Sequence, residues 1–529
     1  MKLTFTLIAL CSYCLLNAQK AGTLDSSFGV DGKVITPANG LLNKIALQSD
    51  GKIIGAGAGN FDSQPPFLII RYNHNGSIDS SFGNSGISGI GVQLSDVLSL
   101  AILPDDAIIA LGRVSAYVNI TKFKKDGTVD SSFGNDGTVI TIAGAFDMPT
   151  DVVIQTDNKI VVGGYIINEP NENRQLLLIR YMPDGSLDNS FGNNGIVILG
   201  AVSGGELPAF YSLNALALQP NGQILASVYL TKGAVYRFNT DGSQDKTFGN
   251  NGTAYFQTKD NSVVNFQAYG LVVQPDGRII GGGSSTKAGG NPLHYMAAAR
   301  LNSNGTIDST FGNSGLQHVL FGNNPSEGTG ILLQKDGKLI VTGRTHPENE
   351  SSSNLALIRF SPFGILDSSF GNNGQAITEV GNIAVGNSSL LQKNGQILLG
   401  GYSDTLGSSF VVARYNNDDK TKRQIIIQKI KHYIATHNDA QATTLNNVSI
   451  YPNPAQNILH VEGLAANAKL TVVDFNGNVI VSRELSPVPS NTGVVSNGYD
   501  LNVSSLHAGN YLLKIETNGE VVTRQFVKE

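Results

Sequence analysis

One nine-residue motif recurs seven times in this 529-residue chain, and this repetition limits the accessible folds more than any other feature. The copies are LDSSFGVDG at 24–32, IDSSFGNSG at 78–86, VDSSFGNDG at 129–137, LDNSFGNNG at 187–195, QDKTFGNNG at 244–252, IDSTFGNSG at 307–315 and LDSSFGNNG at 366–374. Their aspartates are 51 to 63 residues apart, a period typical of propeller blades. Two further motifs, of the types ALQSDGKIIGAG and FLIIRYNHNG, follow each copy in fixed order and give seven units within residues 19–417.

Each unit contains four short runs rich in Ile, Val and Leu, separated by Asp-Gly, Asn-Gly or Gly-rich turns. This pattern predicts four β-strands per unit, joined as hairpins. Small twisted sheets must bury their apolar faces against neighbours, so seven such units predict an all-β, seven-bladed β-propeller of four-stranded blades. A linear solenoid also fits the period, but it would need polar caps, and the terminal units are as apolar as the middle ones.

The order of the motifs predicts how the ring closes. The chain enters on LDSSFG followed by GKVIT, whereas the seventh unit ends after FVVARY without an eighth copy of the motif. We therefore expect the 33–36 strand to pair beside the 410–415 strand, as the outermost strand of the last blade.

Composition agrees with a turn-rich β protein and excludes several partner classes. The chain is 41% hydrophobic and 15% charged, has 61 glycines and no tryptophan, and carries a net charge of −5. A balance this mildly acidic gives no reason to expect nucleic acid or an anionic membrane surface as a partner.

Residues 1–18 have the pattern of a secretory signal peptide: Lys2, an apolar run, then the small residue Ala18. The apolar run of about 14 residues is short for a transmembrane anchor. Both cysteines, Cys11 and Cys14, lie in this segment, so the mature chain has no thiol or disulfide chemistry. No other stretch is apolar enough to predict a membrane span.

The composition changes after the repeats. Residues 418–447 are expected to be a linker, in which the basic stretch 420–434 has an isoleucine face that suits a short amphipathic helix. This helix would be solvated or docked on the propeller, with contact to a membrane surface or lipopolysaccharide as the alternative. Residues 448–529 alternate in the manner of strands and predict a small Ig-like β-sandwich.

The three repeated motifs together resemble the delta-60 repeat family, over about three quarters of the chain. That resemblance implies a propeller-like fold and no defined activity. The departures from the pattern are modest: Asp106 replaces a turn glycine, Gln244 an apolar residue and Lys122 the usual arginine.

The C-terminal segment resembles the type A sorting domain of the type IX secretion system of Bacteroidetes-like bacteria. The residues that carry this resemblance are Tyr451, Pro452, Asn453, Pro454, Gly509 and Tyr511, within VSIYPNPAQNILHVEG and the later AGNYLLKIETNGE. It implies that the secretion machinery recognises 448–529, that the domain is then removed, and that the protein reaches the cell surface or the medium.

The motif itself is interpreted as structural. Its aspartates can accept backbone N–H groups in turns, its glycines permit positive φ, and each phenylalanine supplies about 2 kcal/mol of burial between units. These residues are Asp25, Phe28, Asp79, Phe82, Asp130, Phe133, Asp188, Phe191, Asp245, Phe248, Asp308, Phe311, Asp367 and Phe370. A ring of cation- or sugar-binding aspartates is the weaker alternative.

No catalytic residue, metal site or cofactor is predicted. The calcium-loop pattern is absent, the eight histidines show no ligand spacing, and neither a G-x-S-x-G elbow nor a phosphate-binding glycine loop occurs.

Any localised function is expected where the repeats differ, since loops on a rigid scaffold can vary without harming it. The longest departures are 165–175, 199–212, 284–295 and 344–354. The candidate ligand-binding residues in them are Glu206, Tyr211, His294, Tyr295, His346 and Glu348.

Three functions remain open on the sequence. The favoured one is an exported, non-catalytic binding protein whose propeller contacts a glycan, a protein or the extracellular matrix. The second is a glycan-active hydrolase or lyase, which needs two carboxyl groups about 5 to 10 Å apart. The third is a passive structural module of the cell envelope.

Overall fold

The computed structural model of the chain describes residues 20–59, 67–89, 96–168, 173–200, 212–230, 232–257, 263–287, 294–322, 324–346, 352–417, 448–462, 464, 468–473, 479–485, 498–506, 509–517 and 520–528. The chain divides into two compact units, Met1–Thr421 and Lys422–Glu529. The predicted signal peptide and the predicted linker with its amphipathic helix lie outside the described residues.

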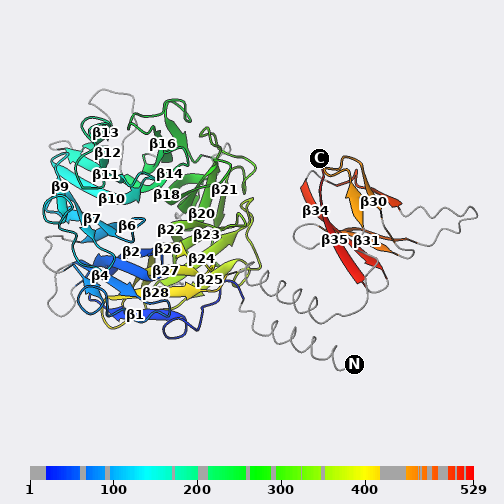
Figure 1. The fold of residues 1–529 in the computed structure, drawn as a ribbon, viewed down its shortest axis with the longest axis horizontal. Helices are drawn as coiled ribbons and strands as arrows, with labels where there is room; N and C mark the ends of the chain where they lie inside the picture. The colour runs from blue at the N-terminus through cyan, green and yellow to red at the C-terminus, as the bar shows by residue number, and fades with distance from the viewer. Residues whose placement is uncertain are drawn as a thin grey trace, which may run out of the picture. The chain divides into compact units, whose positions relative to one another are not determined.

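The first unit consists of seven four-stranded antiparallel sheets, each of which is one blade (Figure 1). From the innermost strand outward, blades 1 to 3 are β2 (Leu41–Leu47), β3 (Ile53–Ala58), β4 (Phe67–Tyr72), β5 (Ile87–Ser88); β6 (Val97–Ile102), β7 (Ile108–Val114), β8 (Tyr117–Phe123), β9 (Thr138–Thr141); and β10 (Phe146–Ile154), β11 (Ile160–Asn168), β12 (Asn173–Tyr181), β13 (Ile196–Leu199).

Blades 4 to 7 continue around the ring in chain order. They are β14 (Ser212–Leu218), β15 (Ile224–Tyr229), β16 (Gly233–Phe238), β17 (Thr253–Tyr255); β18 (Val263–Val273), β19 (Ile279–Lys287), β20 (His294–Leu301), β21 (Leu316–Val319); β22 (Ser326–Leu333), β23 (Leu339–Thr345), β24 (Asn354–Phe360), β25 (Gln375–Thr378); and β26 (Ala384–Leu391), β27 (Ile397–Ser403), β28 (Ser409–Tyr415), β1 (Lys33–Pro37). The innermost strands contact one another in sequence, and β2 also contacts β26. The predicted seven-bladed propeller is thus confirmed, and the linear solenoid is excluded because the ring is closed.

The predicted closure of the ring is also confirmed. Strand β1 pairs antiparallel with β28, with Lys33 opposite Ala413 and Thr36 opposite Phe410. The N–H groups of Gly22 and Asp25 extend this contact by donating to carbonyl oxygens of the last blade. Because a full ladder joins the two ends of the repeat region, the ring has no open end to cap.

The apolar core lies between blades. Each hydrophobic cluster takes side chains from two neighbouring sheets, as where Phe28, Leu42 and Ile70 meet Leu398 and Val412 between blades 1 and 7. Every blade therefore depends on its neighbours for the burial of its faces, which makes the ring one cooperative body.

The second unit contains a three-stranded and a four-stranded antiparallel sheet. Their strands are β29 (Ser449–Tyr451), β30 (Ile458–Glu462) and β33 (Gly498–Asn502) in one, and β32 (Val479–Glu484), β31 (Lys469–Val473), β34 (Gly509–Thr517) and β35 (Glu520–Lys528) in the other. Both sheets contribute to one apolar core, Leu459 and Leu501 from the first and Leu470, Leu513 and Phe526 from the second. This arrangement is the predicted small β-sandwich.

Within the part of the chain that the structure describes, no helix combines the length and the hydropathy that crossing a bilayer requires.

Candidate functional site

The repeated aspartates and phenylalanines lie at the junctions between blades, in seven equivalent clusters that we call nodes. In the node of blade 1, the Asp79 Oδ1 atom accepts hydrogen bonds from the backbone N–H and the hydroxyl of Ser81, at 3.2 and 2.7 Å. Its Oδ2 atom accepts from Arg71 Nε at 2.7 Å and from Lys52 Nζ at 2.8 Å. All three repeated motifs therefore meet at one buried carboxylate.

In six of the seven nodes an arginine reaches across to the next blade. Arg71 Nη1 donates to the carbonyl oxygen of Lys125 at 2.6 Å, and its guanidinium lies 4.6 Å from the ring centroid of Phe82, which is fully buried. Six nodes contain such an arginine over a phenylalanine, and in the seventh Lys122 pairs with Asp130 at 3.0 Å. These contacts hold the ring together, and the node carboxylates are already occupied by protein groups.

The surroundings favour the charged form of the node aspartates. Burial alone would raise the pKa of Asp367, but hydrogen bonds from Ser369 and Lys338 and the charge of Arg359 outweigh it and lower this pKa to about 2. The pKa of each of the other six motif aspartates is also lowered.

The opposite ends of the innermost strands differ from blade to blade. At these ends, six blades pair a residue of the first strand with one of the second strand, and the residue types differ in every blade. The pairs are Leu41 with Ala58, Met148 with Tyr165, Ser212 with Tyr229, Gln267 with Ser284, Glu327 with Arg344 and Val385 with Tyr402. The variable segments 165–175, 199–212, 284–295 and 344–354 also join strands at these ends. The face away from the nodes is thus where the otherwise uniform ring acquires individual residues.

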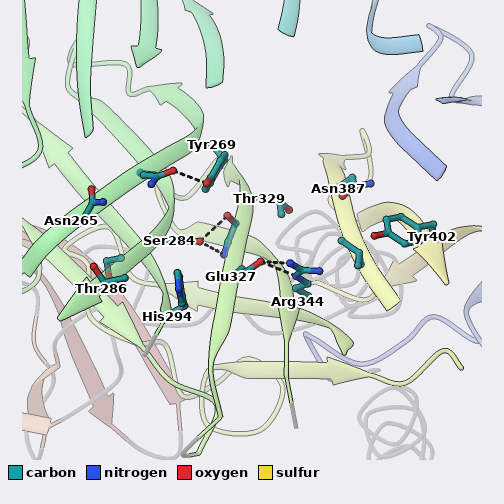
Figure 2. A pocket seen from close by; sticks show the side chains of 14 residues that line it. Asn265, Tyr269, Ser284, Thr286, His294, Glu327, Thr329, Arg344, Asn387 and Tyr402 are labelled. Carbon is teal, nitrogen blue, oxygen red and sulfur yellow. Dashed lines mark hydrogen bonds and ion pairs between the residues drawn. The ribbon is translucent and has the colours of Figure 1, made fainter. Parts of the chain in front are cut away.

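A pocket of about 450 Å³ lies on this variable face, where side chains from blades 5, 6 and 7 converge (Figure 2). It is lined by Asn265, Gln267, Tyr269, Ser284, Ser285, Thr286, His294, Glu327, Gly328, Thr329, Arg344, Val385, Asn387 and Tyr402. The lining combines amides, hydroxyls and two tyrosine rings. Its volume lies within the range of small-molecule binding sites.

The pocket has one ion pair. Arg344 Nε and Nη2 both donate to Glu327 Oε2, at 2.8 and 2.6 Å, and Figure 2 shows the two side chains facing each other across neighbouring strands. The Oε1 atom of Glu327 lies 4.0 Å from His346 Nε2. The arginine compensates the charge of Glu327, the sole carboxylate among the described lining residues.

Two buried polar atoms of the lining have no hydrogen-bond partner among the described residues: Asn265 Oδ1 and Ser285 Oγ. The amide nitrogen of Asn265 donates to the Tyr229 hydroxyl at 2.9 Å, so only its oxygen is left. Because buried polar atoms in proteins are normally paired, these two mark positions where a water or a ligand hydroxyl would be stabilised.

Tyr269 is the most exposed aromatic side chain of the pocket, with 41% of its surface accessible. Its hydroxyl donates to Gln267 Oε1 at 2.7 Å. Desolvation and the charge of Glu327 raise the pKa of this hydroxyl, so it stays protonated at neutral pH and acts as a hydrogen-bonding group rather than a base.

The structure describes three of the six residues nominated from the sequence, His294, Tyr295 and His346. His294 lines the pocket, His346 lies beside Glu327, and Tyr295 packs against His318 with ring centroids 4.8 Å apart. Glu206, Tyr211 and Glu348 lie outside the described residues. Sequence reasoning missed Tyr269, Glu327, Arg344 and Tyr402, although Arg344 begins one of the variable segments it selected.

The sorting-motif residues are part of the packing of the second unit. The side chain of Asn453 makes two hydrogen bonds to strand β35. Its Nδ2 atom donates to the Gln525 carbonyl oxygen at 3.2 Å, and its Oδ1 atom accepts from the Val527 N–H at 2.9 Å. Tyr511 stacks on Phe526, with ring centroids 5.7 Å apart, in strand β34 that Gly509 begins. The Tyr451–Pro452 and Asn453–Pro454 peptide bonds are cis, and Tyr451 is 45% exposed.

Metal chemistry finds no support in the described ranges, where no three His, Cys, Asp or Glu side chains gather as ligands would.

Comparison with protein families identifies both parts of the chain. The model described as a domain of unknown function (DUF5122) beta-propeller matches residues 48–82, 155–191, 219–248, 274–311 and 334–370. The model described as a secretion system C-terminal sorting domain matches residues 449–529. A search of curated proteins found no match.

Among solved structures, the chain is similar to PorZ, a surface component of the type IX secretion system of Porphyromonas gingivalis, with 13% identity and a TM-score of 0.37. That match covers 92% of this chain and only 59% of PorZ. Virginiamycin B lyase from Staphylococcus aureus matches with 11% identity and a TM-score of 0.44, over 72% of this chain and 97% of the lyase. An endo-arabinase from Bacteroides thetaiotaomicron matches with 12% identity and a TM-score of 0.31, over 62% of this chain and 97% of the arabinase.

Similarity at this level says nothing about what the chain binds or whether it acts on it. The family matches and the fold agree, however, with the resemblances that the repeats and the sorting motif carry in the sequence. The chain is a β-propeller protein of DUF5122 repeats that the type IX secretion system exports, by way of a C-terminal sorting domain, to the cell surface or the medium.

Proposed function

We propose that the exported propeller is a non-catalytic glycan-binding protein and that the pocket at blades 5 to 7 holds the glycan. The observation that carries this proposal is the lining itself. Amide groups such as those of Gln267 and Asn387 both donate and accept hydrogen bonds, which is what a sugar hydroxyl requires. Tyr269 and Tyr402 add flat apolar rings against which the C–H face of a sugar can pack.

The size of the pocket favours a glycan over a folded protein partner. A stable protein interface buries about 800 Å² on each side and is spread over a broad surface. A concave site of about 450 Å³ instead encloses a small group, such as a sugar residue within a longer glycan.

The lining also favours binding over hydrolysis. A glycosidase needs a second carboxyl group at about 5 to 10 Å from the first, and Glu327 is the only carboxylate among the described lining residues. Its Oε2 atom accepts hydrogen bonds from two nitrogens of Arg344, so this oxygen is already engaged by a protein donor.

A glycan array probed with the purified chain tests the proposal, followed by an assay for cleavage of every glycan that binds. Binding without turnover is the expected result. Turnover that is lost in Glu327→Gln would establish the hydrolase or lyase in its place, and the absence of any binding would leave the structural envelope module.

A further inference from the structure

The seven blades share one irregularity that makes them comparable position by position. Each innermost strand has a β-bulge at the same level, where one extra residue interrupts the pairing with the second strand. The bulge residues are Asn43, Leu98, Thr150, Asn214, Tyr269, Thr329 and Asn387 in blades 1 to 7. Bulges redirect a side chain out of the regular sheet pattern.

Four of these residues fasten their blade to the next one. In each case the side chain donates to the carbonyl oxygen of the residue just before the next bulge. The bonds run from Asn43 to Val97 at 2.8 Å, from Asn214 to Ala268 at 3.3 Å, from Thr329 to Gly386 at 2.5 Å and from Asn387 to Leu42 at 2.8 Å. The bulge position is therefore a place where a short polar residue stabilises the ring.

Tyr269 departs from this pattern. The residue just before the next bulge is Gly328, so its carbonyl oxygen is the acceptor that the pattern assigns to position 269. That oxygen instead accepts a hydrogen bond from the Ser284 hydroxyl at 3.3 Å. The Tyr269 hydroxyl turns to Gln267 within its own strand. In blade 5 the contact to the next blade therefore comes from Ser284, and the bulge position holds a large aromatic ring that is 41% exposed at the pocket.

Tyr269 leaves 41% of its surface accessible and its hydroxyl bonds within its own strand, so a ligand in the pocket can reach the ring. Aromatic side chains at the centre of a binding site contribute much of the affinity at a small entropic cost. Figure 2 shows Tyr269 among the side chains that converge from blades 5, 6 and 7.

The charges of the pocket restrict the class of ligand. Glu327 and Arg344 neutralise each other, and they are the only Asp, Glu, Lys or Arg side chains among the described lining residues. A carboxylate or sulfate group on a sugar would approach Glu327 without a free cation in that lining to balance it. An uncharged ring meets no such penalty.

Building on the proposed function, we infer that Tyr269 is the ligand-contacting anchor of the pocket and that it packs against an uncharged sugar ring. The ring hydroxyls would lie toward the amides of the lining and toward the unpartnered Asn265 Oδ1 atom.

The variant Tyr269→Asn tests this inference, because it restores the residue that blades 1, 4 and 7 carry at the same bulge. We expect it to fold, with a urea midpoint equal to or above that of the parent chain. Its affinity should fall at least about tenfold, measured by calorimetry on the full chain. The probes are neutral oligosaccharides of glucose, mannose, xylose and galactose, with oligogalacturonate as the acidic comparison. Tyr269→Phe, which keeps the ring, should bind within about threefold of the parent.

The matched control is Phe363→Asn, since Phe363 is an aromatic residue with 64% exposure on the node side of the ring. Its affinity should equal that of the parent. If the parent chain binds none of these oligosaccharides, neutral or acidic, the proposed function and this inference both fall. If the parent binds and Tyr269→Asn binds equally well, only the inference falls, and tighter binding of oligogalacturonate overturns the uncharged class. Should Tyr269→Asn be unstable, Tyr269→Leu decides in its place, and parental affinity in that variant overturns the role of the ring.

Discussion

Replacement of Arg414 by methionine should destabilise the closure of the ring, because Arg414 belongs to the node that joins the two ends of the repeat region. Its Nε atom donates to Asp25 Oδ2 at 2.8 Å, and its Nη2 atom donates to Ser27 Oγ at 3.0 Å. Its Nη1 atom donates to the carbonyl of His74 in blade 1, and its guanidinium lies 4.6 Å from the ring of Phe28.

The magnitude follows from burial. The side chains of Arg414 and Asp25 are 8% and 4% exposed, so removal of the arginine leaves a carboxylate that solvent hardly reaches. The loss of one partner of such a pair costs about 3–5 kcal/mol. Arg414→Lys should cost less, about 1–2 kcal/mol, because a lysine keeps the ion pair, as Lys122 does with Asp130, but loses bonds to Ser27 and His74.

Urea unfolding of the full chain, followed by far-ultraviolet circular dichroism at neutral pH, measures these costs as shifts of the propeller transition. The double variant Asp25→Asn with Arg414→Met should lose less than the two single variants together, since the buried charge is then gone. Lys232→Met, a change at an exposed residue, is the control. The reasoning is refuted if Arg414→Met unfolds at the same urea concentration as that control.

Three further predictions concern acid stability, the bulges and export. The lowered pKa values of the motif aspartates mean that their charged forms stabilise the native state, so the urea midpoint should be steady above pH 5 and fall as the pH drops from about 4 toward 2. Asp367→Asn should lower stability at pH 7 and weaken this dependence, whereas a midpoint that stays constant down to about pH 2.5 would contradict the prediction. Asn387→Ala should cost about 1 kcal/mol through its lost bond to Leu42, while Lys335→Ala, at an exposed turn, should cost less; equal costs would remove the role assigned to the bulge. Deletion of residues 448–529 should leave the protein in the periplasm, as fractionation and immunoblotting would show, and normal delivery of the truncated chain to the surface would disprove the sorting role.

The fold could be predicted because the seven repeats can be compared with one another, which shows the positions that all units share. Three motifs in fixed order define the unit, and the missing eighth copy of LDSSFG predicts that strand β1 completes blade 7. The contact between Arg71 and Asp79 was also accessible, because the two residues are eight apart, as are Arg180 and Asp188 and the other pairs along the chain. With that spacing, the chain folds back after the third strand of the blade, so the motif aspartate lies beside the arginine of that strand.

The pocket could not be predicted in the same way. Glu327 and Arg344 are 17 residues apart, and they meet only because a bulge shifts the register of strands β22 and β23. Tyr269 reads in the sequence as one more residue of an inner strand. The bulge lies five residues before the repeated Gln274 of its blade, but only the strand register shows that this position is a bulge.

The separation of the two faces explains how one ring can be uniform and specific at once. On the node face, each blade pairs its motif aspartate with an arginine or, in blade 2, with Lys122, so a change there weakens the junction with the next blade. On the opposite face, the bulge and the pair beside it can change one blade at a time, because Ser284 can serve the carbonyl that Tyr269 leaves. If the proposed function holds, we expect binding specificity to depend on a few positions per blade. A related ring with asparagine in place of Tyr269 should then keep the fold and lose the aromatic wall of this pocket.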